Sequence, residues 1–128
     1  MDKTALVNKN IEDGKNLIEA LDKSDFPLDG ALWFYFADSD EWRFLLASPL
    51  VDEKGPKEAY ALIQSVLAQL QPSLRISLKH ISVLSPKSEL IQLLRRAIRT
   101  GPGISEIRFT RNTINNKFIE DAFIYRIK

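Results

Sequence analysis

The sequence predicts an α+β fold, in which three helices cover a mixed, largely antiparallel sheet of five strands in the order α-β-β-α-β-α-β-β. Three observations lead to this class: an aromatic hairpin pattern within residues 30–50, three amphipathic stretches bounded by proline or glycine, and a second hairpin pattern within residues 105–127. The chain has 128 residues, of which 45% are hydrophobic and 27% charged, as in ordinary globular proteins. We therefore expect residues 1–128 to form a single domain.

The hairpin is predicted to form the centre of the sheet. Residues 31–37 and 42–48 are rich in strand-forming side chains and flank the acidic loop 38–41. Within the first strand, apolar residues occupy positions of both parities, so both of its faces should be buried, as in an interior strand. The predicted core positions of this hairpin are Leu32, Phe34, Phe36, Phe44 and Leu46.

Helical spacing of apolar residues predicts the three helices. The first runs from about Asn8 to Lys23, and the second from Pro56 to about Leu70 after a polar connection at 51–56. A strand is expected near His80–Leu84. Ser85 and Pro86 form a helix-start signal, and Gly101 suits the residue after a helix, so the third helix is predicted from Pro86 to about Thr100.

The second hairpin is predicted to pair 105–114 with 118–127. Ile107 and Phe109 face the core together with Ile119, Phe123 and Tyr125 only if positions of like parity oppose each other. That condition excludes a two-residue turn at Asn115-Asn116 and favours the three-residue loop 115–117. The outer face would then be polar, except for Phe118 and Ile124.

Charge is distributed unevenly along the chain. Residues 1–58 carry 13 acidic and 7 basic side chains, whereas residues 75–111 carry 8 basic and 2 acidic ones. Such asymmetry fits either a polyanion-binding face or two faces that attract each other. The chain has no cysteine, no signal-peptide pattern and no run of about 18 apolar residues, so a cytoplasmic location without a membrane partner is expected.

The basic cluster near the predicted end of the third helix is a candidate anion-binding site. Arg95 and Arg99 would lie one helical turn apart beside Arg96, and the glycines would let a phosphate approach the backbone. However, phosphate-binding loops precede helix N-termini, whereas arginines at a C-terminus also simply stabilise the helix. The candidate residues are Arg95, Arg96, Arg99, Gly101 and Gly103.

Two acidic segments near predicted strand ends form a second candidate site. Pro27-Leu28-Asp29 followed by Asp52-Glu53-Lys54, in an α-β-β order, resembles the metal-dependent nuclease superfamily that includes many restriction endonucleases. The resemblance implies that two acids hold a divalent metal and that the lysine positions a water. In that family, however, the second acid and the lysine alternate on one strand, whereas here they precede a helix.

The remaining polar groups predict neither a metal site nor a cofactor site. The acidic loop 38–41 lacks the glycine and the distant glutamate of a calcium loop. His80 is the only histidine, and there is no cysteine, so these residue types cannot form a zinc site. A strand-edge histidine without a catalytic role is expected.

Three functions from different classes remain open at this point. The leading one is a non-catalytic binding or self-assembling protein, which acts through a protein partner or a second copy. The alternative is a nucleic-acid accessory protein that uses the basic region 75–111. The second alternative is a divalent-metal nuclease.

Overall fold

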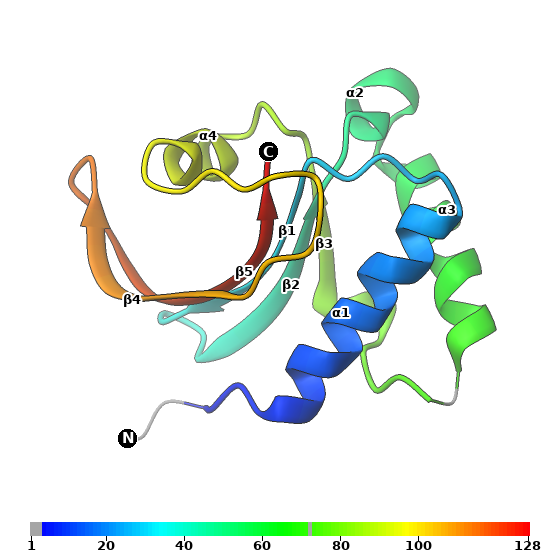
Figure 1. The fold of residues 1–128 in the computed structure, drawn as a ribbon, viewed down its shortest axis with the longest axis horizontal. Helices are drawn as coiled ribbons and strands as arrows, with labels where there is room; N and C mark the ends of the chain where they lie inside the picture. Colours follow the sequence, from blue (N-terminus) through cyan, green and yellow to red (C-terminus); the bar gives the residue numbers. More distant parts are fainter. Residues whose placement is uncertain (1–3, 72) are drawn as a thin grey trace.

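β1 (Gly30–Phe36) lies at the centre of a five-stranded mixed sheet with the strand order β3-β2-β1-β5-β4 (Figure 1). The computed structural model describes residues 4–71 and 73–128, and within them the predicted class and element order are confirmed. One short helix is added to the prediction. The elements are α1 (Asn8–Lys23), β1, β2 (Glu41–Ala47), α2 (Leu50–Lys54), α3 (Pro56–Leu70), a 3₁₀ turn (Leu78–His80), β3 (Ile81–Leu84), α4 (Glu89–Arg95), β4 (Ile107–Ile114) and β5 (Lys117–Ile127).

The central position of β1 agrees with the apolar residues at both its odd and its even positions, which point to opposite faces of the sheet. β1 pairs antiparallel with β2 on one side and with β5 on the other. Leu32 and Trp33 point to opposite faces, and both are buried. β3 joins β2 in parallel, so β3 and β4 form the two edges of the sheet.

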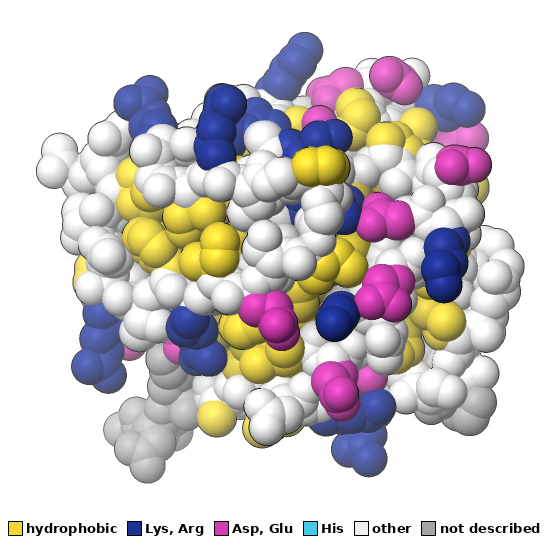
Figure 2. Space-filling view, in the orientation of Figure 1, with side chains coloured by type: hydrophobic (Ala, Val, Ile, Leu, Met, Phe, Trp, Pro, Cys, Tyr) yellow, Lys and Arg dark blue, Asp and Glu magenta, His cyan; other side chains and the backbone are white. Residues whose placement is uncertain are grey.

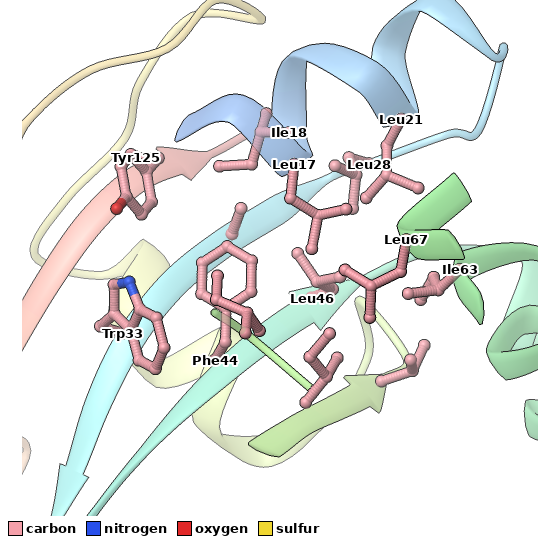
Figure 3. Packing of buried hydrophobic residues seen from close by; sticks show 14 of the residues in the cluster. Leu17, Ile18, Leu21, Leu28, Trp33, Phe44, Leu46, Ile63, Leu67 and Tyr125 are labelled. Atoms are coloured by element: carbon pink, nitrogen blue, oxygen red, sulfur yellow. The ribbon is translucent and has the colours of Figure 1, made fainter. Parts of the chain in front are cut away.

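α1 and α3 close one face of the sheet. Trp33, Phe44 and Leu46 from the central strands pack beneath leucines and isoleucines of these two helices (Figure 3). On this face the buried Tyr125 hydroxyl donates to the Ile11 carbonyl at 2.6 Å. Burial raises the pKa of Tyr125 well above its usual value.

The opposite face is covered mainly by α4, which has only seven residues. Its Ile91 and Leu94 are fully buried against Leu32 and other residues of the sheet. Phe34 and Phe36 remain half-buried on this face. Burial is therefore confirmed for Leu32, Phe44 and Leu46. The prediction of a largely buried position was wrong for Phe34 and Phe36, because none of the described elements lies across the outer part of this face.

The third predicted helix is shorter than expected, and one connection is helical. α4 begins at Glu89, because the Ser85 hydroxyl accepts from the Lys87 N–H (3.0 Å) and holds residues 85–88 in a turn. Beyond Arg95 the chain leaves the helix, and the Thr100 N–H donates to the Ile127 carbonyl (2.7 Å). The predicted polar connection at 51–56 contains α2.

The second hairpin has a two-residue turn instead of the predicted three-residue loop. Ile114 pairs with Lys117, and both turn residues, Asn115 and Asn116, have positive φ (48° and 67°). The predicted loop assumed that successive side chains of the strand point to opposite faces of the sheet throughout. That alternation is interrupted at Arg111, which has φ 47°. A register shift also occurs where β5 pairs with β1 between residues 31 and 32. As a result, Ile107 and Phe109 pair with Ile124 and Ala122 and share the α4 face, whereas Phe123 and Tyr125 face α1.

Candidate functional site

An open groove lies between α4 and the β4–β5 hairpin, on the half-covered face of the sheet. It has a volume of about 590 Å³. Figure 2 shows a hydrophobic patch at the left of the molecule, between the positions of α4 and the hairpin in Figure 1. The apolar lining residues are Phe34, Leu90, Leu93, Phe118 and Ile119, and the polar ones are Glu89, Gln92, Arg96, Asn115 and Lys117.

The short length of α4 creates one wall of this groove. Ile91 and Leu94 face the sheet, so Leu90 and Leu93, each one position earlier, are turned toward one side of the helix by about 100°. That side faces the hairpin and is only half-buried. A helix of seven residues is about 10 Å long, which is too short to cover the remaining sheet surface.

The β4–β5 hairpin forms the other wall of the groove, and a two-residue turn joins its strands at this end. Ile114 and Ile119 on its inner side are buried. Asn115 and Asn116 tolerate the left-handed conformation that a two-residue turn requires. Next to this buried pair, Phe118 has 62% of its surface exposed. An exposed aromatic beside an apolar hollow is typical of a surface that contacts another molecule.

The rim of the groove carries charges of both signs. Glu89 lies in the first turn of α4, Arg96 follows its last turn, and Lys117 begins β5. None of these three side chains forms an ion pair with residues 4–71 or 73–128. An apolar floor with a few unpaired polar groups around it is the usual composition of a binding groove.

The three arginines of the predicted anion-binding cluster do not form one site. Arg95 donates from Nε to the Lys128 carbonyl (2.6 Å) and from Nη1 to the Pro86 carbonyl (3.2 Å). Arg96 lines the groove, and Arg99 lies beyond the helix end. The expectation that Arg95 and Arg99 share one helical face was therefore wrong.

The glycines of that cluster lie in an exposed loop. A side chain at Gly101 or Gly103 would meet no atom within 4 Å. The Gly103 carbonyl accepts from Arg126 Nε at 3.1 Å, so part of this loop is held by β5. Anion binding by these residues stays a prediction.

The basic excess within residues 75–111 is spread over both faces of the sheet. Arg108 donates two hydrogen bonds of 2.7 Å to the buried carboxylate of Asp121 on the α1 face, and this pairing raises the pKa of Arg108. Arg75 lines a separate hollow beside Trp33 and His80. These arginines therefore do not extend the basic rim that Arg96 forms on the α4 face.

The nuclease-like acids have other contacts. Asp29 lies 3.6 Å from Lys128 Nζ, and Asp52 accepts from the Ser85 hydroxyl at 2.8 Å. Asp52 and Lys54 belong to α2, so the second acid and the lysine are not on a strand. Among the described residues, no group of three or more acidic, histidine or cysteine side chains has an arrangement that could hold a metal ion.

The acidic loop and the histidine make local contacts. Asp40 accepts from the Tyr35 hydroxyl (2.6 Å) and from the backbone and side chain of Thr4 (both 3.0 Å). These hydrogen bonds lower the pKa of Asp40, and the bond to Asp40 raises the pKa of Tyr35 to about 12. His80 Nδ1 lies 2.9 Å from the Ser77 hydroxyl, three residues earlier.

The groove was not predicted from the sequence, although two signals in the sequence point to it. Phe118 and Ile124 did not fit the predicted polar face of the hairpin. Residues 90–94 also place leucines beside the buried pair Ile91 and Leu94, so the helix is apolar over more than one side.

Comparisons with known proteins found no matching family model, no matching curated protein and no matching solved structure. In the part of the chain that the structure describes, no helix combines the length and the apolar character needed to cross a membrane. The groove is therefore interpreted from its own geometry and chemistry.

Proposed function

We propose that this chain is a non-catalytic binding domain that holds an apolar segment of a protein chain in the groove between α4 and the β4–β5 hairpin. The observation that carries this proposal is the contrast between a face of the sheet closed by two long helices and a face left open above Phe34, Leu93 and Ile119. Exposed apolar surface of this kind costs free energy in water unless another molecule covers it.

The chemistry of the groove favours a protein segment over a polyanion. Its floor is apolar, and its rim pairs the negative Glu89 with the positive Arg96 and Lys117. A nucleic acid would bind through several phosphates, for which unpaired cations without neighbouring acids are best suited. A protein segment presents apolar side chains and both charges, so it fits this lining better. The cytoplasmic location stays a prediction.

An apolar fluorescent probe, 8-anilinonaphthalene-1-sulfonate, tests whether the groove accepts apolar ligands. In dilute solution, where the protein is monomeric and the groove is unoccupied, we expect saturable binding at one site of the folded protein, because the rings fit the floor and the sulfonate can meet Arg96 or Lys117. Leu93→Glu places a charge on the groove wall and should weaken binding by about tenfold or more, which corresponds to about 1.4 kcal/mol.

The matched control is Leu62→Glu. Leu62 is an exposed leucine of α3, 42% accessible and outside the groove, so this variant should bind the probe as the wild type does. Cooperative thermal unfolding of each variant shows that the probe is not reporting a loosened core. Absence of saturable binding, or equal weakening in both variants, would contradict the proposed function.

A further inference from the structure

We infer that the segment held in the groove is α4 of a second copy of this chain, so that two copies pack their α4 helices antiparallel about a two-fold axis. This inference rests on the proposed function, because it names the occupant of the same groove. In such a dimer each α4 lies between its own sheet and the sheet of the other copy, and it covers the surface that seven residues leave open.

The residue pattern of α4 agrees with a helix packed on two sides. Ile91 and Leu94 are fully buried against the chain's own sheet. Glu89, Leu93 and Arg96 are spaced at i, i+4 and i+7 and therefore share the flank that lines the groove. A helix with apolar residues on only one side needs one packing partner, whereas α4 has a second apolar side, Leu90 and Leu93, that the described chain leaves only half-buried.

The charges on this flank match themselves under a two-fold axis. An antiparallel arrangement about the middle of α4 brings Glu89 of one copy to Arg96 of the other, and symmetry repeats this pair. Within one chain the two residues are about 10 Å apart along the helix, so they do not satisfy each other. A purely acidic partner would oppose Glu89, and a purely basic partner would oppose Arg96 and Lys117. A second copy satisfies both signs.

Sedimentation of the purified protein over a range of concentrations tests the dimer directly. The wild type should shift from monomer to dimer as concentration rises. Leu93→Glu should remain monomeric, because it buries a charge at the centre of the interface, and Leu62→Glu should dimerise as the wild type does. A wild type that stays monomeric at its highest attainable concentration would overturn the inference.

Charge reversal provides a readout that a loss of fold cannot imitate. Glu89→Arg alone and Arg96→Glu alone each place like charges together twice and should weaken dimerisation. An equimolar mixture of the two variants should form a heterodimer, because both contacts then join an arginine to a glutamate. A wild-type dimer together with a monomeric mixture would show that the interface lies elsewhere, and the inference would be wrong.

The failure of this inference is distinguishable from the failure of the proposed function. Probe binding is measured on the wild type at concentrations below those at which it dimerises, where the groove should be unoccupied. If the wild type binds the probe but does not dimerise at any attainable concentration, the groove takes another protein and only the second copy is excluded. If the monomeric wild type binds no probe, the groove function itself is contradicted.

Discussion

The two faces of the sheet differ in how completely helices cover them. On one face α1 and α3, of 16 and 15 residues, bury Trp33, Phe44 and Leu46. On the other face α4 has seven residues, and Phe34 and Phe36 stay half-buried. The strands present similar aromatic and aliphatic side chains to both faces. The comparison shows that the length of the covering helix, more than the hydrophobicity of the strands, separates a core from a candidate binding surface.

Polar contacts strengthen the same contrast. On the closed face, Arg126 is 3% exposed and donates to both carboxylate oxygens of Asp22 at the end of α1 (3.0 and 2.8 Å). Asp13 of α1 is fully buried, and it accepts from the Arg75 N–H (3.0 Å) and lies 2.9 Å from Lys9 Nζ. On the groove flank of α4, by contrast, Glu89 and Arg96 form no ion pair with any described residue. The closed face is therefore fixed within the chain, and the open face retains groups that can contact another molecule.

The largest expected difference is between two phenylalanines of the central hairpin. Phe44→Ala removes a fully buried ring and should lower the free energy of unfolding by about 3–5 kcal/mol. Phe34→Ala removes a half-buried ring at the groove and should cost about 1–2 kcal/mol, because less surface leaves water on folding. Urea unfolding in one buffer measures the free energy of unfolding of both variants. Equal costs would show that the two faces do not differ as described.

A smaller effect is expected at Gly14, where α1 approaches the sheet closely. A Cβ atom there would lie 2.6 Å from the Tyr125 hydroxyl oxygen and 3.0 Å from Trp33 Nε1, so Gly14→Ala should cost about 1–3 kcal/mol through overpacking. Gly101→Ala, in the exposed loop after α4, meets no atom within 4 Å and should be close to neutral. Thermal unfolding compares the two alanine variants. A neutral Gly14→Ala would mean that the closed face tolerates extra volume.

The smallest effect concerns pH and the contact between Tyr35 and Asp40 near the hairpin loop. Folding lowers the pKa of Asp40, so its contribution to stability is present at neutral pH and is lost as the pH falls through the folded-state value. Folding raises the pKa of Tyr35 from 10.0 to about 12, so its contribution is present below pH 10 and is lost as the pH rises toward 12. In Asp40→Asn, the melting temperature should therefore depend less on pH, both in the acidic range and between pH 10 and 12. Unchanged pH dependence in this variant would contradict the assignment.

Local sequence signals predicted most of the elements, because their physical causes are local. Helical spacing before Pro27 and after Pro56 located α1 and α3, and the apolar residues of both parities predicted the central position of β1. The candidate site was not predictable in this way. It depends on where α4 ends, and the chain that follows this end is held by hydrogen bonds between Thr100 and Ile127, which are 27 positions apart.

The sequence by itself determined the α+β class, the order of the elements and the central hairpin, because periodicity, proline and glycine act within a few residues. Only the tertiary structure decided the register of the second hairpin, where the positive φ of Arg111 interrupts the alternation that parity assumes. It also decided which apolar residues remain accessible. Leu93 and Leu94 are adjacent leucines, and only the packing of α4 on the sheet makes Leu94 a core residue and Leu93 part of the groove wall.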